Sequence, residues 1–175
     1  MLDTATAYNR YKFIGHEFLT WLWYRIEMDN IVLNHSDLAT MTLALGKRMV
    51  LENPRENHAE TITIKGGYSN FETGFLPLKQ GALVTEMSLE AKSQEVTWEF
   101  NLKGESLAVA NMRISNLGPT ETDEDIEASV LEKVYVLEQI HLYIDTLFEK
   151  FMILRISNQW DQKVVPQMQQ WLQIH

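Results

Sequence analysis

The 175-residue chain has no cysteine, so disulfides, thiolate metal sites and a cysteine nucleophile are excluded. It has only four prolines, while 45% of its residues are hydrophobic, which is typical of a globular chain and not of a disordered one. No apolar run approaches the roughly 20 residues needed to span a bilayer. The first ten residues lack the basic and apolar pattern of a secretion signal. We therefore expect one compact cytoplasmic domain.

Positive charge is also scarce, because 15 basic residues face 24 acidic ones and the net charge is −9. That balance is unusual for a protein that coats nucleic acid. Four basic residues of the first part nevertheless fall in or beside predicted turns, namely Lys47, Arg48, Arg55 and Lys65. Lysine and arginine on turns can reach phosphates while acidic faces stay away from them. Simple solubility explains the same residues, so charge alone does not decide between the two interpretations.

Motifs for catalysis are missing. None of the five histidines lies three or four residues from another, and no G-x-S-x-G or complete phosphate-binding loop is present. Glu86 and Glu90 share one strand face, as do Glu95 and Glu99, and paired carboxylates can hold a metal for nuclease chemistry. A solvated sheet face opposite the apolar one is the more common reason for such pairs. We expect no enzyme activity, cofactor or metal.

Hydrophobic periodicity predicts helices at both ends of the chain. Residues 7–29 are apolar on most sides, which indicates a helix buried on most sides. A long helix is expected to begin after Thr120 or Thr122, either of which can cap it, and to run to about Ile156, because acidic residues follow at its positive end. A short final helix is expected over 160–173.

Between these helices the apolar period changes to two, which indicates strands. Gly46-Lys47 is interpreted as a tight hairpin turn. The strands are expected at 40–45, 49–51, 61–64, 82–91, 95–102 and 107–115. The predicted fold is therefore α+β, with about five or six antiparallel strands in residues 1–116 and a helical region in 117–175.

Large aromatic side chains cluster in the predicted helices. Phe18, Trp21, Trp23 and Trp160 could mark an exposed patch or an oligomer interface, since aromatic residues are enriched where proteins meet. Core packing is the more common reason for such residues. Both interpretations are open at the level of sequence.

One segment carries a family resemblance. The run Gly15-His-Glu-Phe-Leu-Thr-Trp-Leu-Trp-Tyr24 resembles the signature helix of RdgC-type recombination-associated proteins. Leu45–Glu52, Thr61–Gly67 and Lys79–Leu89 follow in the order of that family's next segments. The resemblance covers roughly residues 12–172, although family members also carry a region that precedes the signature helix.

The resemblance implies a fold and a function that composition does not show. RdgC-type proteins form ring-shaped homodimers that encircle duplex DNA with little sequence preference and limit access of the strand-exchange recombinase. Lys65 falls on the family's basic turn and is the first candidate for DNA contact. Lys47, Arg48 and Arg55 are candidates from charge alone.

The expected protein is thus a non-catalytic, nucleoid-associated DNA-binding protein that modulates recombination. Its expected partners are duplex DNA and a second copy of the chain. A recombinase, or a second chain supplying the region that precedes the signature helix, is a further expected partner. The alternative is an interaction module that is derived from the same fold and has lost DNA binding.

Overall fold

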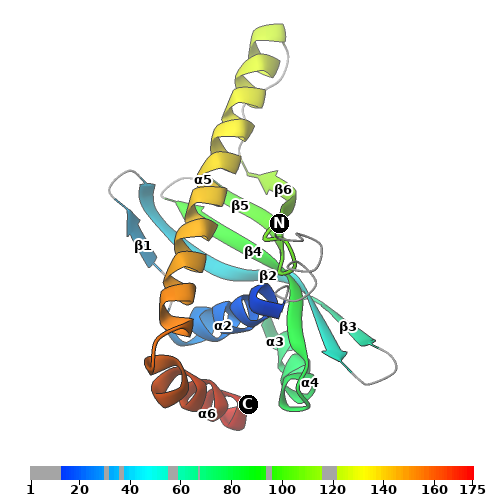
Figure 1. The fold of residues 1–175 in the computed structure, drawn as a ribbon. Helices are drawn as coiled ribbons and strands as arrows, with labels where there is room; N and C mark the ends of the chain where they lie inside the picture. The colour runs from blue at the N-terminus through cyan, green and yellow to red at the C-terminus, as the bar shows by residue number, and fades with distance from the viewer. Residues whose placement is uncertain are drawn as a thin grey trace, which may run out of the picture.

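The computed structural model describes residues 13–29, 32–35, 38–54, 59–66, 68–93, 96–115 and 122–175. It confirms the α+β class, with one helix before the sheet and a long helix followed by a short one after it (Figure 1). The first helix, α2 (Phe13–Asp29), and the sheet together form most of the core. Residues 7–12 of the predicted helix lie outside the described residues.

Six antiparallel strands form one sheet in the order β1-β2-β4-β5-β6, and β3 also pairs with β2. These strands are β1 (Val32–His35), β2 (Leu38–Pro54), β3 (Ala59–Lys65), β4 (Leu83–Ser93), β5 (Val96–Lys103) and β6 (Val109–Ile114). Strand β2 is long enough to pair with β1 along its first half and with β3 along its second half, while β4 runs along its other edge. The short segments α3 (Tyr68–Phe71), η1 (Glu72–Gly74) and α4 (Phe75–Lys79) connect β3 to β4.

The predicted hairpin at Gly46-Lys47 is wrong, because β2 continues through both residues. The pairing of β2 with β4 shifts between Leu45 and Met49, so the strand carries a bulge here. A Cβ atom on Gly46 would lie 2.2 Å from Oγ of Ser88 and 2.9 Å from its carbonyl carbon. The glycine is therefore needed for close approach of two strands, not for a turn.

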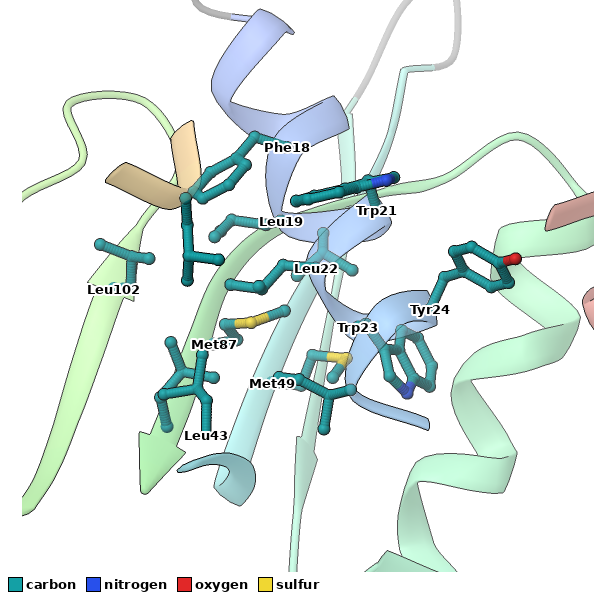
Figure 2. Close-up of a cluster of buried hydrophobic side chains, with 14 of the residues drawn as sticks. Phe18, Leu19, Trp21, Leu22, Trp23, Tyr24, Leu43, Met49, Met87 and Leu102 are labelled. Atoms are coloured by element: carbon teal, nitrogen blue, oxygen red, sulfur yellow. The ribbon is translucent and has the colours of Figure 1, made fainter. Parts of the chain in front are cut away.

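Helix α2 lies on one face of the sheet and is buried almost all round (Figure 2). Leu19 and Leu22 meet methionines and leucines that project from β2, β4 and β5. At its first turn, a Cβ atom on Gly15 would lie 1.7 Å from the carbonyl oxygen of Gly104, so only glycine fits where the helix meets the β5–β6 turn. The buried hydroxyl of Thr20 accepts a hydrogen bond from the backbone N–H of Val84 at 3.1 Å, which fixes the helix to the start of β4.

Helix α5 (Asp123–Arg155) is a single 33-residue helix, as predicted. Thr122 caps it, since its side chain accepts from the backbone N–H of Asp125 and the Asp125 carboxylate accepts from the backbone N–H of Thr122. Its buried residues begin only at Val136 and end at Phe151. The first third of α5 therefore extends beyond the rest of the protein, as Figure 1 shows.

The chain ends with η2 (Trp160–Val164) and α6 (Val165–Ile174), and Pro166 lies in the first turn of α6, as expected from its missing N–H. Glu27 near the end of α2 links α6 to the core through a side-chain hydrogen bond. One of its carboxylate oxygens accepts a hydrogen bond from Nε1 of Trp23 at 2.6 Å, and the other accepts from Nε1 of Trp171 at 2.8 Å. The Glu27 side chain is only 5% exposed, so this carboxylate satisfies two buried indoles and is itself satisfied by them.

We predict that Glu27→Gln destabilises the protein by about 1–3 kcal/mol. The amide offers one acceptor oxygen where the carboxylate offers two, so one indole N–H loses its partner. Urea denaturation followed by tryptophan fluorescence measures the effect. The control Glu149→Gln changes an exposed residue of α5 and should leave stability unchanged. Equal stability of both variants with the parent chain would contradict the role given to Glu27.

We predict that Tyr143→Phe stabilises the protein by about 1 kcal/mol at pH 7, because the buried Tyr143 hydroxyl makes no hydrogen bond with the residues that the structure describes. Burial also raises the pKa of Tyr143 from 10.0 to about 12. The unfolded chain releases this proton first, so stability that is intact below pH 10 is lost as pH rises from 10 toward 12. In thermal melts, Tyr143→Phe should therefore reduce the fall in melting temperature between pH 10 and pH 12. Tyr135→Phe, which changes an exposed tyrosine, should leave that fall as it is in the parent chain.

Candidate functional site

The sheet has one apolar face, which α2 covers, and one polar face on which no described helix packs. Alternation along the strands places polar side chains on this second face, and residues paired across antiparallel strands share it. Arg48 lies opposite Lys65, Glu86 opposite Lys103, and Glu99 opposite Arg113. The face is therefore built by five neighbouring strands.

Positive charge collects on this polar face although the whole chain is acidic. Glu52, Glu86, Glu90 and Glu99 are the acidic residues that the described strands place there. The basic residues there are Lys47, Arg48, Lys65, Lys92, Lys103 and Arg113. The face thus has a small positive balance, in contrast to the net charge of −9 for the chain.

A cleft of about 500 Å³ opens on the same face, over β2, β3, β4 and β5. Its walls include Arg48, Thr61, Thr63, Glu86 and Lys103, together with His16 from the first turns of α2. The hydroxyl groups, Arg48 and Lys103 are suited to hydrogen bonding with phosphate and sugar oxygens, whereas the carboxylates Glu52, Glu86 and Glu105 in the same walls oppose an anion. No cluster of apolar side chains lines this cleft, so it does not resemble a pocket for an apolar ligand.

Glu86 organises the floor of the cleft. Its Oε1 accepts from a guanidinium nitrogen of Arg48 and from the amide nitrogen of Asn101 at 3.2 Å. These contacts join β2, β4 and β5 across the polar face. Part of the positive charge of Arg48 is therefore already balanced within the protein, and an anion in the cleft would compete with Glu86 for it.

The structure brings three of the four predicted DNA-contact residues together at one end of the β2–β3 pair. Lys65 lies opposite Arg48, and the backbone N–H of Gly66 donates to the carbonyl oxygen of Lys47 at 2.9 Å. Lys65 is exposed, and its ammonium group forms no ion pair with the described residues. The Lys47 side chain is 80% exposed, and its Nζ lies 4.0 Å from Oε1 of Glu99. An exposed ion pair at this distance holds the lysine weakly. Arg55 lies outside the described residues.

Sequence reasoning missed Lys103. It ends β5, lines the cleft, is exposed, and forms no ion pair with the described side chains. The rule that selected Lys47, a basic residue at a predicted turn, applies equally to Lys103 at the Lys103-Gly104-Glu105 turn. Only the pairing of β4 with β5 shows that it faces the same cleft as Arg48.

The proposed interface residues need correction. Phe18 and Trp23 are fully buried, and Trp21 and Trp160 are 4% and 7% exposed within the single chain. Phe18 and Trp21 pack against Phe151 of α5, and Trp23 packs against Trp171 of α6. These side chains hold the helices onto one another, so they are not available to a partner.

The carboxylates that could have supported nuclease chemistry have cation partners. Glu86 binds Arg48, and Oε1 of Glu90 lies 2.7 Å from Nζ of Lys92. Over the ranges that the structure describes, no group of three or more histidine, aspartate or glutamate side chains is placed to hold a metal ion. Glu95 lies outside those ranges.

No protein-family model matches the chain, and no curated protein matches it either. Among the described helices, none combines the length and the apolar character that crossing a membrane requires. The residues of the polar face are therefore the main indication of function.

Proposed function

We propose that the protein binds duplex DNA without sequence preference through the polar face of its sheet, in the manner of the RdgC-type proteins that its sequence resembles. In this proposal it acts in homologous recombination by occupying DNA and performs no catalysis. The observation that carries the proposal is the excess of basic residues on an open sheet face of an acidic chain.

The placement of Lys65 and Lys103, which form no ion pair with the described residues, supports phosphate contact over base contact. Lys65 lies at the end of β3 and Lys103 at the end of β5, so both ammonium groups are free to follow a phosphate backbone across the sheet. Lysine and arginine contacts to phosphate position DNA without reading its sequence. The resemblance adds a homodimer and a recombinase as partners to this proposal.

The net charge of −9 opposes DNA binding at long range but does not decide it. Carboxylates separated from the polar face by more than the Debye length, about 8 Å at physiological ionic strength, are largely screened. Many of them belong to α5, whose buried side chains join the core on the apolar face of the sheet and whose first residues extend beyond it. Phosphate contact then depends on the local balance of the face.

We predict that Lys65→Glu weakens binding of a fluorescent duplex about tenfold at low salt, because one phosphate contact is replaced by repulsion. Fluorescence anisotropy at low and at moderate salt measures the effect, and binding by the parent chain should fall steeply with salt. The matched control Lys163→Glu makes the same charge change on η2 and should bind nearly as the parent does. Equal loss in both variants would mean that net charge, not this face, governs binding.

We predict the opposite sign for Glu86→Gln, which should bind the duplex roughly fivefold more tightly. The amide retains an acceptor for Arg48 and Asn101 but removes the negative charge that competes with phosphate. The same anisotropy titration measures this gain. Glu138→Gln, on an exposed position of α5, removes one negative charge away from the cleft and should give little gain.

A second candidate is a protein-interaction module whose sheet face does not contact DNA. The observation that favours it is the exposed apolar surface of α5, where six large side chains are about half exposed or more. Absence of duplex binding by the parent chain at low salt would select this candidate.

A further inference from the structure

The part of α5 that extends beyond the sheet is an apolar helix surface that no other described residue covers. We call residues Asp123–Tyr135 the α5 tip, since α5 has no buried residue before Val136. At 1.5 Å per residue the tip is about 20 Å long. Its exposed apolar side chains are Ile126, Val130, Leu131, Val134 and Tyr135, which are 49–63% exposed.

The spacing of these side chains is that of a helix-packing surface. Ile126, Val130 and Val134 follow one another at intervals of four and form one row, and Leu131 and Tyr135 form a second row beside it. Together they expose on the order of 500 Å² of contiguous apolar surface, a size at which patches mark interaction sites. A helix of this length without tertiary support gains stability when such a surface is covered.

The tip is also strongly acidic. It carries five carboxylates and a single lysine, Lys133. The helix dipole and the capping box account for Asp123, Glu124 and Asp125 in the first turn. They do not account for Glu127, which lies one turn before Leu131 in line with the second row, or for Glu132, which lies beside Tyr135 at the outer edge of that row.

This charge decides between two kinds of partner. If two copies paired through their tips, ten carboxylates and two lysines would lie along helices whose axes are about 8–10 Å apart. That separation is close to the Debye length of about 8 Å, so the repulsion would be only partly screened. A partner helix with the same apolar rows and with lysine or arginine on their flanks would turn each of these repulsions into an attraction.

We propose that the α5 tip is a docking surface for an amphipathic helix of another protein, with an apolar stripe flanked by basic residues. The helix packs against both apolar rows, and its basic side chains lie beside Glu127, in line with the second row, and beside Glu132 at the outer edge of that row. The proposal does not depend on DNA binding, because the tip contributes no residue to the polar face.

The test uses two labelled peptides of two heptads each. One repeats Leu-Lys-Lys-Leu-Leu-Lys-Leu, and the other has glutamate in place of every lysine. Fluorescence anisotropy with the full chain should show binding of the lysine peptide and at least tenfold weaker binding of the glutamate peptide. Binding of the lysine peptide should weaken as salt rises.

A triple variant of the α5 tip and a matched triple variant elsewhere test where the peptide binds. The variant Ile126→Gln, Val130→Gln, Val134→Gln keeps the charge of the tip, and glutamine favours helix at least as well as the residues it replaces. It should bind the lysine peptide about tenfold more weakly. The matched variant Leu76→Gln, Ile153→Gln, Ile174→Gln removes three exposed apolar side chains elsewhere and should bind as the parent does.

Several results would overturn the proposal. They are absence of lysine-peptide binding, binding that the tip variant leaves unchanged, and equal binding of the glutamate peptide. A fourth is a parent chain that is dimeric by light scattering and becomes monomeric in the tip variant, because the occupant would then be a second copy. Duplex binding measured on the same variants separates these results from the DNA proposal, since the tip variant should bind duplex as the parent does.

Discussion

Burial of α2 is the constraint on which the other elements depend. The helix has apolar side chains on nearly every side, so one covering layer cannot bury it. The sheet covers one side, α5 covers a second through Phe148 and Phe151, and α6 covers a third through Trp171. Polar contacts then set the positions of these layers, because Arg155 donates to Glu17 at 2.8 Å and Trp171 donates to Glu27.

This arrangement leaves the two candidate surfaces free. Since α2 and the helices around it occupy the apolar face of the sheet, the opposite face is left for polar side chains. Helix α5 is longer than the core that it covers, so its first 13 residues extend beyond it. The polar face and the α5 tip are thus both consequences of how one buried helix is enclosed.

The sequence alone predicted most of the helices and strands, but fewer of the residues that form the candidate binding surface. Periodicity located α2, α5 and the strands from β2 to β6, although not β1, and Thr120 or Thr122 followed by acidic residues marked the start of α5. It failed at Gly46-Lys47, because a glycine needed for close strand approach has the same local pattern as a turn glycine. It failed for Trp21 and Trp160 because burial depends on which helices pack together, and for Lys103 because strand pairing, not local pattern, places it in the cleft.

Net charge shows why a whole-chain quantity is a poor guide to this protein. The value of −9 combines a sheet face with a small positive balance and a helix tip with an excess of four negative charges. Screening over about 8 Å means that each surface responds to its own charges. Surfaces of opposite sign on different elements can therefore bind partners of opposite charge, and an anionic ligand on the sheet need not interfere with a basic partner on α5.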